Sequence, residues 1–156
     1  MGMSIPCVER PSPETSLRMA NVRQQGTEPE VALRRELFRS GLRYRVNYAV
    51  IKKPRRVADI AFPRLKIAVF VDGCFWHGCP VHATWPKRNA EFWRQKIEAN
   101  RLRDADTTAR LRDEGWMVLR IWEHEAPSEA AKTVIELITV ARSSLREVPA
   151  TPRTKN

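Results

Sequence analysis

Cysteine and histidine side chains cluster in the segment "VDGCFWHGCPVH", residues 71–82. Cys74, Cys79 and His82 have the spacing C-x4-C-x2-H, and His124 follows an apolar segment further along the chain. Two thiolates and two imidazoles form a closed tetrahedral set of the kind that structural zinc takes. We therefore expect these four residues to bind Zn²⁺. The alternative is a pair of buried thiols beside two surface histidines.

An acid stands within the second apolar segment, "RVADIAF", residues 56–62. A charge at Asp59 is costly there unless a partner binds it, and either an arginine or a divalent cation would serve. The next apolar segment ends in Val71-Asp72, and adjacent strand ends would bring these residues near Asp59. Two interpretations stay open: an arginine partner for Asp59, or a Mg²⁺ site to which Val71 contributes its backbone carbonyl oxygen.

Glu30 and His77 are two further candidates for the active site. Glu30 stands three residues after Thr27, which is the spacing of a capping box at a helix start. The first turn of that helix can also face an active site, and both roles stay open. His77 is placed to move protons during phosphodiester hydrolysis. Its alternatives are a surface histidine or a competing zinc ligand.

The elements that must position these residues follow from the apolar pattern and from helix-capping and turn signals. We expect helices over 27–41, 89–115 and 128–145, and strands over 43–50, 56–62, 66–72 and 116–122. The first strand alternates like a half-buried one, and the third is apolar enough to be buried on both faces. Three consecutive strands, then a helical crossover into a fourth, predict an α/β fold with a mixed central sheet flanked by helices.

Length and composition bound the class of protein. The 156 residues fit one domain, which we expect over 16–146 between flexible tails at 1–15 and 147–156. There is no apolar run long enough to span a membrane and no secretory signal region. Three cysteines, an odd number, argue against a disulfide framework. We expect a monomeric cytoplasmic protein, associated with the nucleoid, whose thiols are reduced.

The charge balance indicates the kind of partner. The chain has 28 Lys and Arg against 18 Asp and Glu, a net charge of +10. Such a field suits a polyanion, nucleic acid before an anionic membrane surface. A basic solvated surface is the alternative.

Several motifs occur in a fixed order along the chain: "RMANVRQQGTEPEVALRRELFRSGLRYRV", "VFVDGCFWHGCPVH", "NAEFWRQKIEANRLRD" and "GWMVLRIWEHE". Over residues 16–125 they resemble the very short patch repair (Vsr-type) mismatch endonucleases. The resemblance implies a restriction-endonuclease-like fold with an αβββαβ core, in agreement with the order of elements above. It also implies a magnesium-dependent endonuclease. Such an enzyme nicks double-stranded DNA 5′ to the thymine of a T:G mismatch left by deamination of 5-methylcytosine.

The resemblance also assigns roles to single residues. Asp59 matches a metal-binding aspartate, Val71 a backbone metal ligand, Glu30 an active-site acid and His77 a catalytic histidine. The zinc set expected above matches the family's structural zinc ligands.

The DNA contacts come from the same resemblance. Phe75, Trp76 and Trp93 match aromatic residues that intercalate beside the mismatch, and Met19 matches a residue that probes the opposite groove. From the pattern alone, Trp93 fits a core position on a helical stripe. Packing beneath the zinc loop is the alternative for Phe75 and Trp76.

Two departures from the family stand out. Asp72 occupies a position where some relatives have a histidine, and it could bind magnesium, orient His77 or act as a base. The segment before Asp59 lacks the Pro-Gly-x-Pro approach and has Arg55, Arg56 and Val57 instead.

Two other functions are rivals to this one. They are a restriction-type nuclease that acts on matched DNA and a non-catalytic, zinc-stabilised DNA-binding module. Mismatch-repair proteins are further expected partners.

Overall fold

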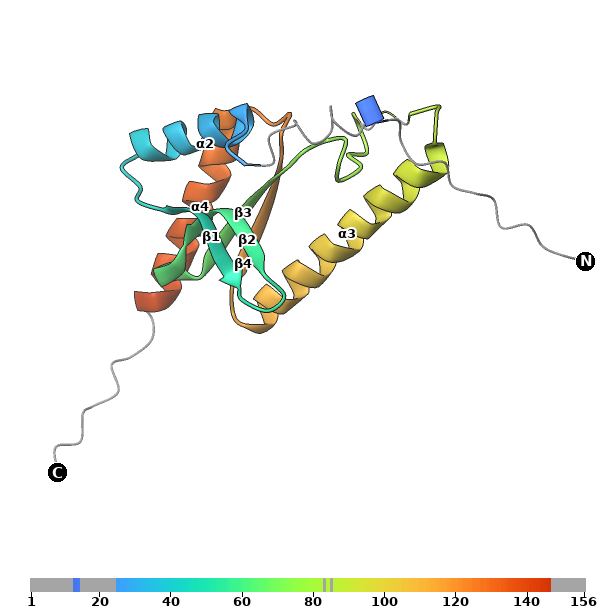
Figure 1. The fold of residues 1–156 in the computed structure, drawn as a ribbon. Helices are drawn as coiled ribbons and strands as arrows, with labels where there is room; N and C mark the ends of the chain where they lie inside the picture. Colours follow the sequence, from blue (N-terminus) through green and yellow to red (C-terminus); the bar gives the residue numbers. More distant parts are fainter. Residues whose placement is uncertain (1–12, 15–24, 83, 85, 147–156) are drawn as a thin grey trace, which may run out of the picture.

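The computed structural model describes residues 13–14, 25–82, 84 and 86–146. Met19 and Cys7 lie outside the described residues, as do the tail at 147–156 and nearly all of the tail at 1–15. The elements run in the expected order (Figure 1). They are α2 (Glu28–Arg39), β1 (Arg45–Ile51), β2 (Arg56–Phe62), the 3-10 turn η1 (Pro63–Leu65), β3 (Ile67–Asp72), α3 (Ala90–Asp113), β4 (Met117–Trp122) and α4 (Pro127–Arg146).

The four strands form one mixed sheet in the order β1-β2-β3-β4. The pairs β1/β2 and β2/β3 are antiparallel, and β4 returns parallel to β3 after the α3 crossover. The predicted α/β class and mixed sheet are confirmed. In the parallel pair Asp72 lies opposite Trp122, so the chain leaves β3 and β4 at the same edge of the sheet.

Helices cover both faces of the sheet (Figure 1). Helices α2 and α4 pack together on one face, where Leu33, Leu37, Val134 and Ile138 form a buried cluster with the β2 and β3 side chains. The long helix α3 covers the other face, and its Leu111 is fully buried among small and aromatic strand residues. None of the described helices is both long enough and apolar enough to cross a membrane.

The burial of β3 agrees with the expectation from the sequence, whereas that of β1 does not. Strand β3 is buried along nearly its whole length, as its apolar run predicts. Strand β1 does not show the expected half-buried alternation, because its first three residues are all exposed. It is an edge strand, and Asn47 adopts a positive φ of 48° that interrupts the regular pleat. Only Val50 and Ile51, at its end, enter the core.

The helix ends follow the expected signals in part. Gly41 and Gly115 follow the ends of α2 and α3 with φ of 78° and 80°, a conformation that favours glycine. Asn89 stands at the N-cap of α3, but its φ is 57° and its side chain makes no capping hydrogen bond. The capping box at Thr27 is incomplete too: the hydroxyl donates to the Glu30 carboxylate instead of accepting from a helix N–H.

Candidate active site and metal centre

A cleft of about 640 Å³ brings the predicted active-site residues together. Glu30 comes from α2, Asp59 from β2, Val71 and Asp72 from the end of β3, and His77 from the loop that follows. Four arginines also line the cleft, at positions 55, 56, 103 and 120. Carboxylates within a ring of guanidinium groups suit the binding of a cation together with a phosphate.

Asp59 is the acid in the cleft that no arginine contacts among the described residues. Its Oδ2 accepts a hydrogen bond of 2.7 Å from the backbone N–H of Val71. The pKa of Asp59 is raised to about 6, chiefly by burial and also by the nearby charges of Glu30 and Asp72, whereas the hydrogen bond from Val71 opposes the rise. An arginine partner for Asp59, one of the two alternatives, is therefore not found in the described part of the chain. A bound cation would offset the same electrostatic cost.

Glu30 is held by three donors at the start of α2. The N–H of Gly26 donates at 2.8 Å, the Thr27 hydroxyl at 3.1 Å and Nη2 of Arg34 at 3.0 Å. The side chain is only 3% exposed, and this burial strengthens each bond. These bonds fix the carboxylate within its own turn while it faces the cleft.

Asp72 is paired with Arg120 of the neighbouring strand β4. Nη1 of Arg120 donates to Oδ1 of Asp72 at 2.8 Å and to Oδ2 at 2.9 Å. Nη2 of Arg120 lies 3.3 Å from Oδ1 of Asp104 on α3, and the guanidinium stacks over the Phe70 ring. One guanidinium group thus bridges two carboxylates and links β3, β4 and α3.

His77 is oriented by the same cluster of charges. Its Nδ1 is hydrogen-bonded to Oδ2 of Asp104 and lies 3.9 Å from Oδ1 of Asp72. Burial lowers the pKa of His77, but the hydrogen bond to Asp104 and the charge of Asp72 outweigh it and raise the pKa. The pKa of Asp104 is lowered in turn: burial raises it, but the bond to His77 and the charge of Arg120 prevail. With Nδ1 bound, Nε2 is the nitrogen left to exchange a proton.

Sequence reasoning assigned no role to Asp104 or Arg120. Both stand inside the quoted motifs, "NAEFWRQKIEANRLRD" and "GWMVLRIWEHE". Their presence in these motifs is the only sequence signal that could have pointed to a role. Their contacts with His77 and with each other could not be predicted, because these depend on how α3 and β4 pack around the loop.

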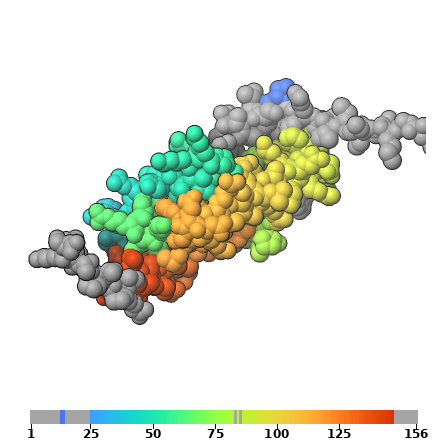
Figure 2. Space-filling view, turned by 90° about the horizontal axis from the view of Figure 1, so that it is seen from below, coloured from blue at the N-terminus to red at the C-terminus, as the bar shows by residue number. Residues whose placement is uncertain are grey.

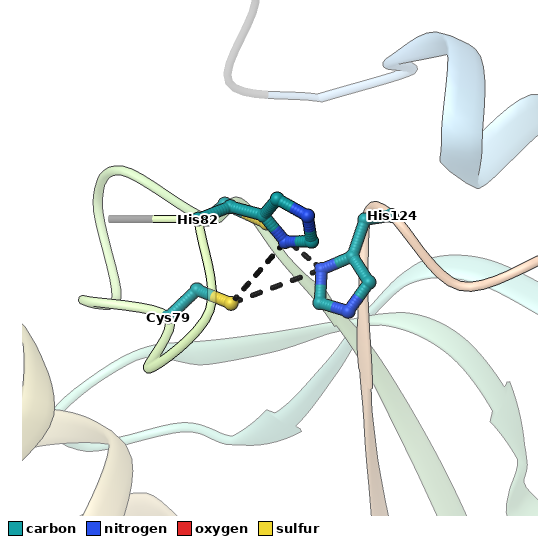
Figure 3. A group of neighbouring side chains, drawn as sticks. Cys79, His82 and His124 are labelled. Carbon is teal, nitrogen blue, oxygen red and sulfur yellow. Dashed lines mark hydrogen bonds between the residues drawn. The ribbon is translucent and has the colours of Figure 1, made fainter. Parts of the chain in front are cut away.

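The four predicted zinc ligands converge beside the cleft. Cys74 and His124 each stand two residues beyond the paired Asp72 and Trp122, so the parallel register brings them together. Nδ1 of His124 lies 3.1 Å from Sγ of Cys74 and 3.8 Å from Sγ of Cys79. Nδ1 of His82 lies 3.9 Å from Sγ of Cys79. Figure 3 shows the rings of His82 and His124 pointing toward the Cys79 thiol.

This donor set fits zinc. In a tetrahedral site with zinc–sulfur bonds of about 2.3 Å and zinc–nitrogen bonds of about 2.0 Å, sulfur and nitrogen ligands stand about 3.5 Å apart. The three sulfur–nitrogen distances, from 3.1 to 3.9 Å, span that value. His77 is hydrogen-bonded to Asp104 instead and takes no part in this cluster, as the ligand assignment expected.

The loop between the two centres is clamped from both sides. Asn100 of α3 donates to the carbonyl of Trp76, and Arg101 donates to the carbonyls of His77 and Gly78. Glu123 accepts the N–H of Cys74 at 2.7 Å. Gly78 has φ of 61°, and a Cβ there would lie 3.0 Å from side-chain atoms of α3. The loop therefore approaches α3 at a position where only glycine fits without displacement.

The aromatic residues of the loop pack as one cluster with α3. The ring of Phe75 lies 5.2 Å from that of Trp76 and 5.5 Å from that of Trp93, with edge-to-face geometry. Trp93 is only 6% exposed, whereas Phe75 and Trp76 are half-buried. The core position that the helical pattern favours for Trp93 is therefore the one it occupies. In this conformation Trp93 supports the other two rings from below.

Replacement of Arg120 by methionine tests the shared ion pairs. The stem keeps its apolar volume, but Asp72, 6% exposed, and Asp104 lose their shared cation. Because the Arg120 side chain is 24% exposed, we expect unfolding in urea to show a loss of about 2–4 kcal/mol, below the range for a fully buried pair.

The matched control is Arg110→Met, which removes a surface pair with Asp106 on α3. It should leave the unfolding midpoint unchanged within error. Equal midpoints for the two variants would show that the Arg120 cluster contributes no more than a surface pair.

Comparison with known proteins identifies the family. The model of the family described as DNA mismatch endonuclease Vsr matches residues 11–83. The type II nicking enzyme V.NaeI of Lentzea aerocolonigenes is 41% identical over 137 residues, which cover 82% of this chain and 80% of that enzyme. The type II nicking enzyme V.NmeDIP of Neisseria meningitidis serogroup C is 42% identical over 126 residues, covering 76% and 80%. The DNA mismatch endonuclease Vsr of Escherichia coli (strain K12) is 34% identical over 110 residues, covering 69% and 68%. The chain therefore belongs to the Vsr family, and it is an endodeoxyribonuclease.

Proposed function

We propose that this endonuclease requires magnesium and nicks double-stranded DNA 5′ to the thymine of a T:G mismatch. One observation carries the proposal: Asp59, the acid without an arginine contact among the described residues, lies in one cleft with Val71 and His77. The half-buried Phe75 and Trp76 directly precede His77, which lines that cleft. The proposed cut in a single strand is supported by the relatives described as nicking enzymes. The proposed mismatch substrate is supported by the E. coli relative, which is described as a mismatch endonuclease.

Asp59 and the carbonyl oxygen of Val71 are the proposed ligands of the divalent cation. When bound, magnesium would polarise the scissile phosphate and stabilise the leaving oxygen. Oδ2 of Asp59 accepts the hydrogen bond from the N–H of Val71. Oδ1 is therefore the oxygen we propose as the cation ligand. The fit is supported by the raised pKa of Asp59, near 6, since burial and neighbouring acids make its negative charge costly without a cation.

His77 is the proposed group for proton transfer. Its Nδ1 is fixed by Asp104, and Asp72 faces the same nitrogen at 3.9 Å. This arrangement leaves Nε2 to exchange a proton with the attacking water or the leaving oxygen. We assign Asp72 the orienting role, not metal binding, because both of its oxygens already accept hydrogen bonds from Arg120. Glu30 acts from the edge of the cleft, where it adds negative charge beside Asp59.

The aromatic loop is the proposed mismatch reader. Phe75 and Trp76 would enter the base stack, and the unstacking this requires costs least where pairing is already weak. Trp93 supports both rings, so its contact with DNA depends on a rearrangement of the cluster. Met19, outside the described residues, remains the proposed probe of the opposite groove.

Zinc at Cys74, Cys79, His82 and His124 is the proposed structural element that holds this loop. Two of the ligands flank Phe75, Trp76 and His77 in the sequence, so a bound ion would restrict all three. We further propose that residues 16–146 act as one monomeric domain and that mismatch-repair proteins assist it.

Nick mapping tests the proposed reaction. We use strand-labelled T:G and T:A duplexes with randomised flanks, so that an unknown sequence context cannot hide the activity. In magnesium, the T:G duplex should be nicked in one strand, directly 5′ to the mismatched thymine. Asp59→Asn should lower that rate by about 10²–10³-fold or more, because the carboxylate that binds the cation is lost.

Asp113→Asn is the control for that variant, since Asp113 is an exposed acid at the far end of α3. It should nick like the unmodified chain. Cleavage of both strands of the T:A duplex would instead indicate a restriction-type nuclease. Full activity of Asp59→Asn would remove Asp59 from the metal site.

Metal analysis tests the zinc site. The purified chain should contain one zinc per molecule, and Cys79→Ser should lose most of it, because Cys79 is a buried thiol among the four ligands. Cys7→Ser makes the same substitution at a cysteine with no assigned role and should retain zinc. An unmodified chain without zinc, or equal zinc in both variants, would refute the assignment.

A further inference from the structure

A basic turn borders the cleft. It joins β1 to β2 and has the sequence "KKPRR", residues 52–56, with four cationic side chains in five residues. Arg55 and Arg56 line the cleft. We call residues 52–56 the basic turn. Because net charge alone makes much of this surface basic, a role for the turn must rest on its position and contacts.

The basic turn is anchored to α3 through one of its arginines. Nε of Arg56 donates to the Thr107 hydroxyl at 3.0 Å, and Nη2 of Arg56 lies 3.6 Å from Oδ2 of Asp106. In the view of Figure 2, the segment that contains the turn (teal) lies against α3 (yellow to orange). Arg56 is thus used to fix the turn in place.

The other three cations of the turn are free to bind a ligand. Lys52, Lys53 and Arg55 are exposed. In the described part of the chain, none of the three has a carboxylate within ion-pair distance, whereas Arg34, Arg56 and Arg120 each have one. Three unpaired cations on a fixed turn form a preorganised site for phosphate groups.

The spacing along β2 indicates which phosphate the turn would meet. Arg56 and Asp59 are three residues apart on one strand, a span of about 10 Å. One DNA strand rises 3.4 Å along the helix axis per nucleotide, so about 10 Å corresponds to a few nucleotides at most. If the scissile phosphate lies at Asp59, the turn faces backbone within a few nucleotides of it.

We propose that the basic turn is a second DNA-binding site, which binds the phosphate backbone within a few nucleotides of the nick. The position of the nick rests on the proposed function, whereas the binding of duplex DNA by the turn does not. Lys53 and Arg55 hold phosphates without reading bases, so they strengthen binding to matched and mismatched duplexes alike. This contact fixes the register of the duplex over the cleft.

The test compares two variants with the same change in charge. Lys53→Gln with Arg55→Gln removes two cations from the turn. Arg142→Gln with Arg146→Gln removes two exposed cations from α4, which covers the opposite face of the sheet from α3. Binding to T:G and T:A duplexes is measured in calcium without magnesium, from 50 to 200 mM salt.

We expect the turn variant to bind both duplexes more weakly and to lower the slope of log affinity against log salt by about 1.8, at about 0.9 per lost phosphate contact. Over this fourfold range of salt, the affinity advantage of the unmodified chain then shrinks about tenfold. The α4 variant should keep the original slope. Equal losses of affinity and slope in both variants would show that only the net charge matters, which would contradict the proposal. An unchanged slope in the turn variant would also overturn it.

Single methylphosphonate substitutions then locate the contact. Neutralising one of the phosphates within a few nucleotides of the expected nick should weaken the unmodified chain but not the turn variant. Equal weakening of both at every position would contradict the assignment. A chain that binds duplexes but nicks none would refute the proposed function and leave the comparison of affinities and salt slopes valid.

Discussion

Repulsion among four carboxylates in one cleft is the constraint on which the rest of this site depends. They belong to Glu30, Asp59, Asp72 and Asp104. Arg34 binds the first, and Arg120 binds the last two, with both oxygens of Asp72 occupied. Asp59 is left with a backbone N–H, and its raised pKa reports the cost. The protein thus pairs three acids with two of its own arginines and leaves the fourth without one, which supports the proposed cation site at Asp59.

The sheet topology places two centres at one edge. Because β3 and β4 are parallel and paired from Ile67 to Asp72, the residues that follow both strands emerge together. Cys74 and His124 meet there, and the loop that carries His77 is clamped to α3 between the cysteine–histidine cluster and the cleft. A rigid loop would keep the half-buried aromatic pair and His77, the proposed proton-transfer group, in a fixed relation to the proposed cation site.

The sequence predicted local elements well and tertiary charge pairs poorly. Strand β2 has the expected ends, since its apolar run is bounded by basic and proline residues. The cysteine–histidine cluster was predicted from ligand type and from clustering in the sequence, whereas its C-x4-C-x2-H spacing is not the common one and added only a moderate signal. The ion pairs of Arg120 were not, because they depend on the parallel register and on where α3 crosses. Trp93 illustrates the same point: helical pattern placed it correctly in the core, whereas the resemblance alone placed it on DNA. The exposure of β1 followed from its edge position, which alternation cannot reveal.

The central claim is that a divalent cation binds between Asp59 and Val71, and iron-directed cleavage tests it most directly. Iron(II) with ascorbate, added to zinc-saturated protein, generates radicals that cut the chain next to the bound ion. The account predicts cuts in β2 near Asp59 and at the end of β3 near Val71, both suppressed by excess magnesium and absent from Asp59→Asn. Cuts confined to the Cys74 and His124 segments, or an unchanged pattern in Asp59→Asn, would contradict it.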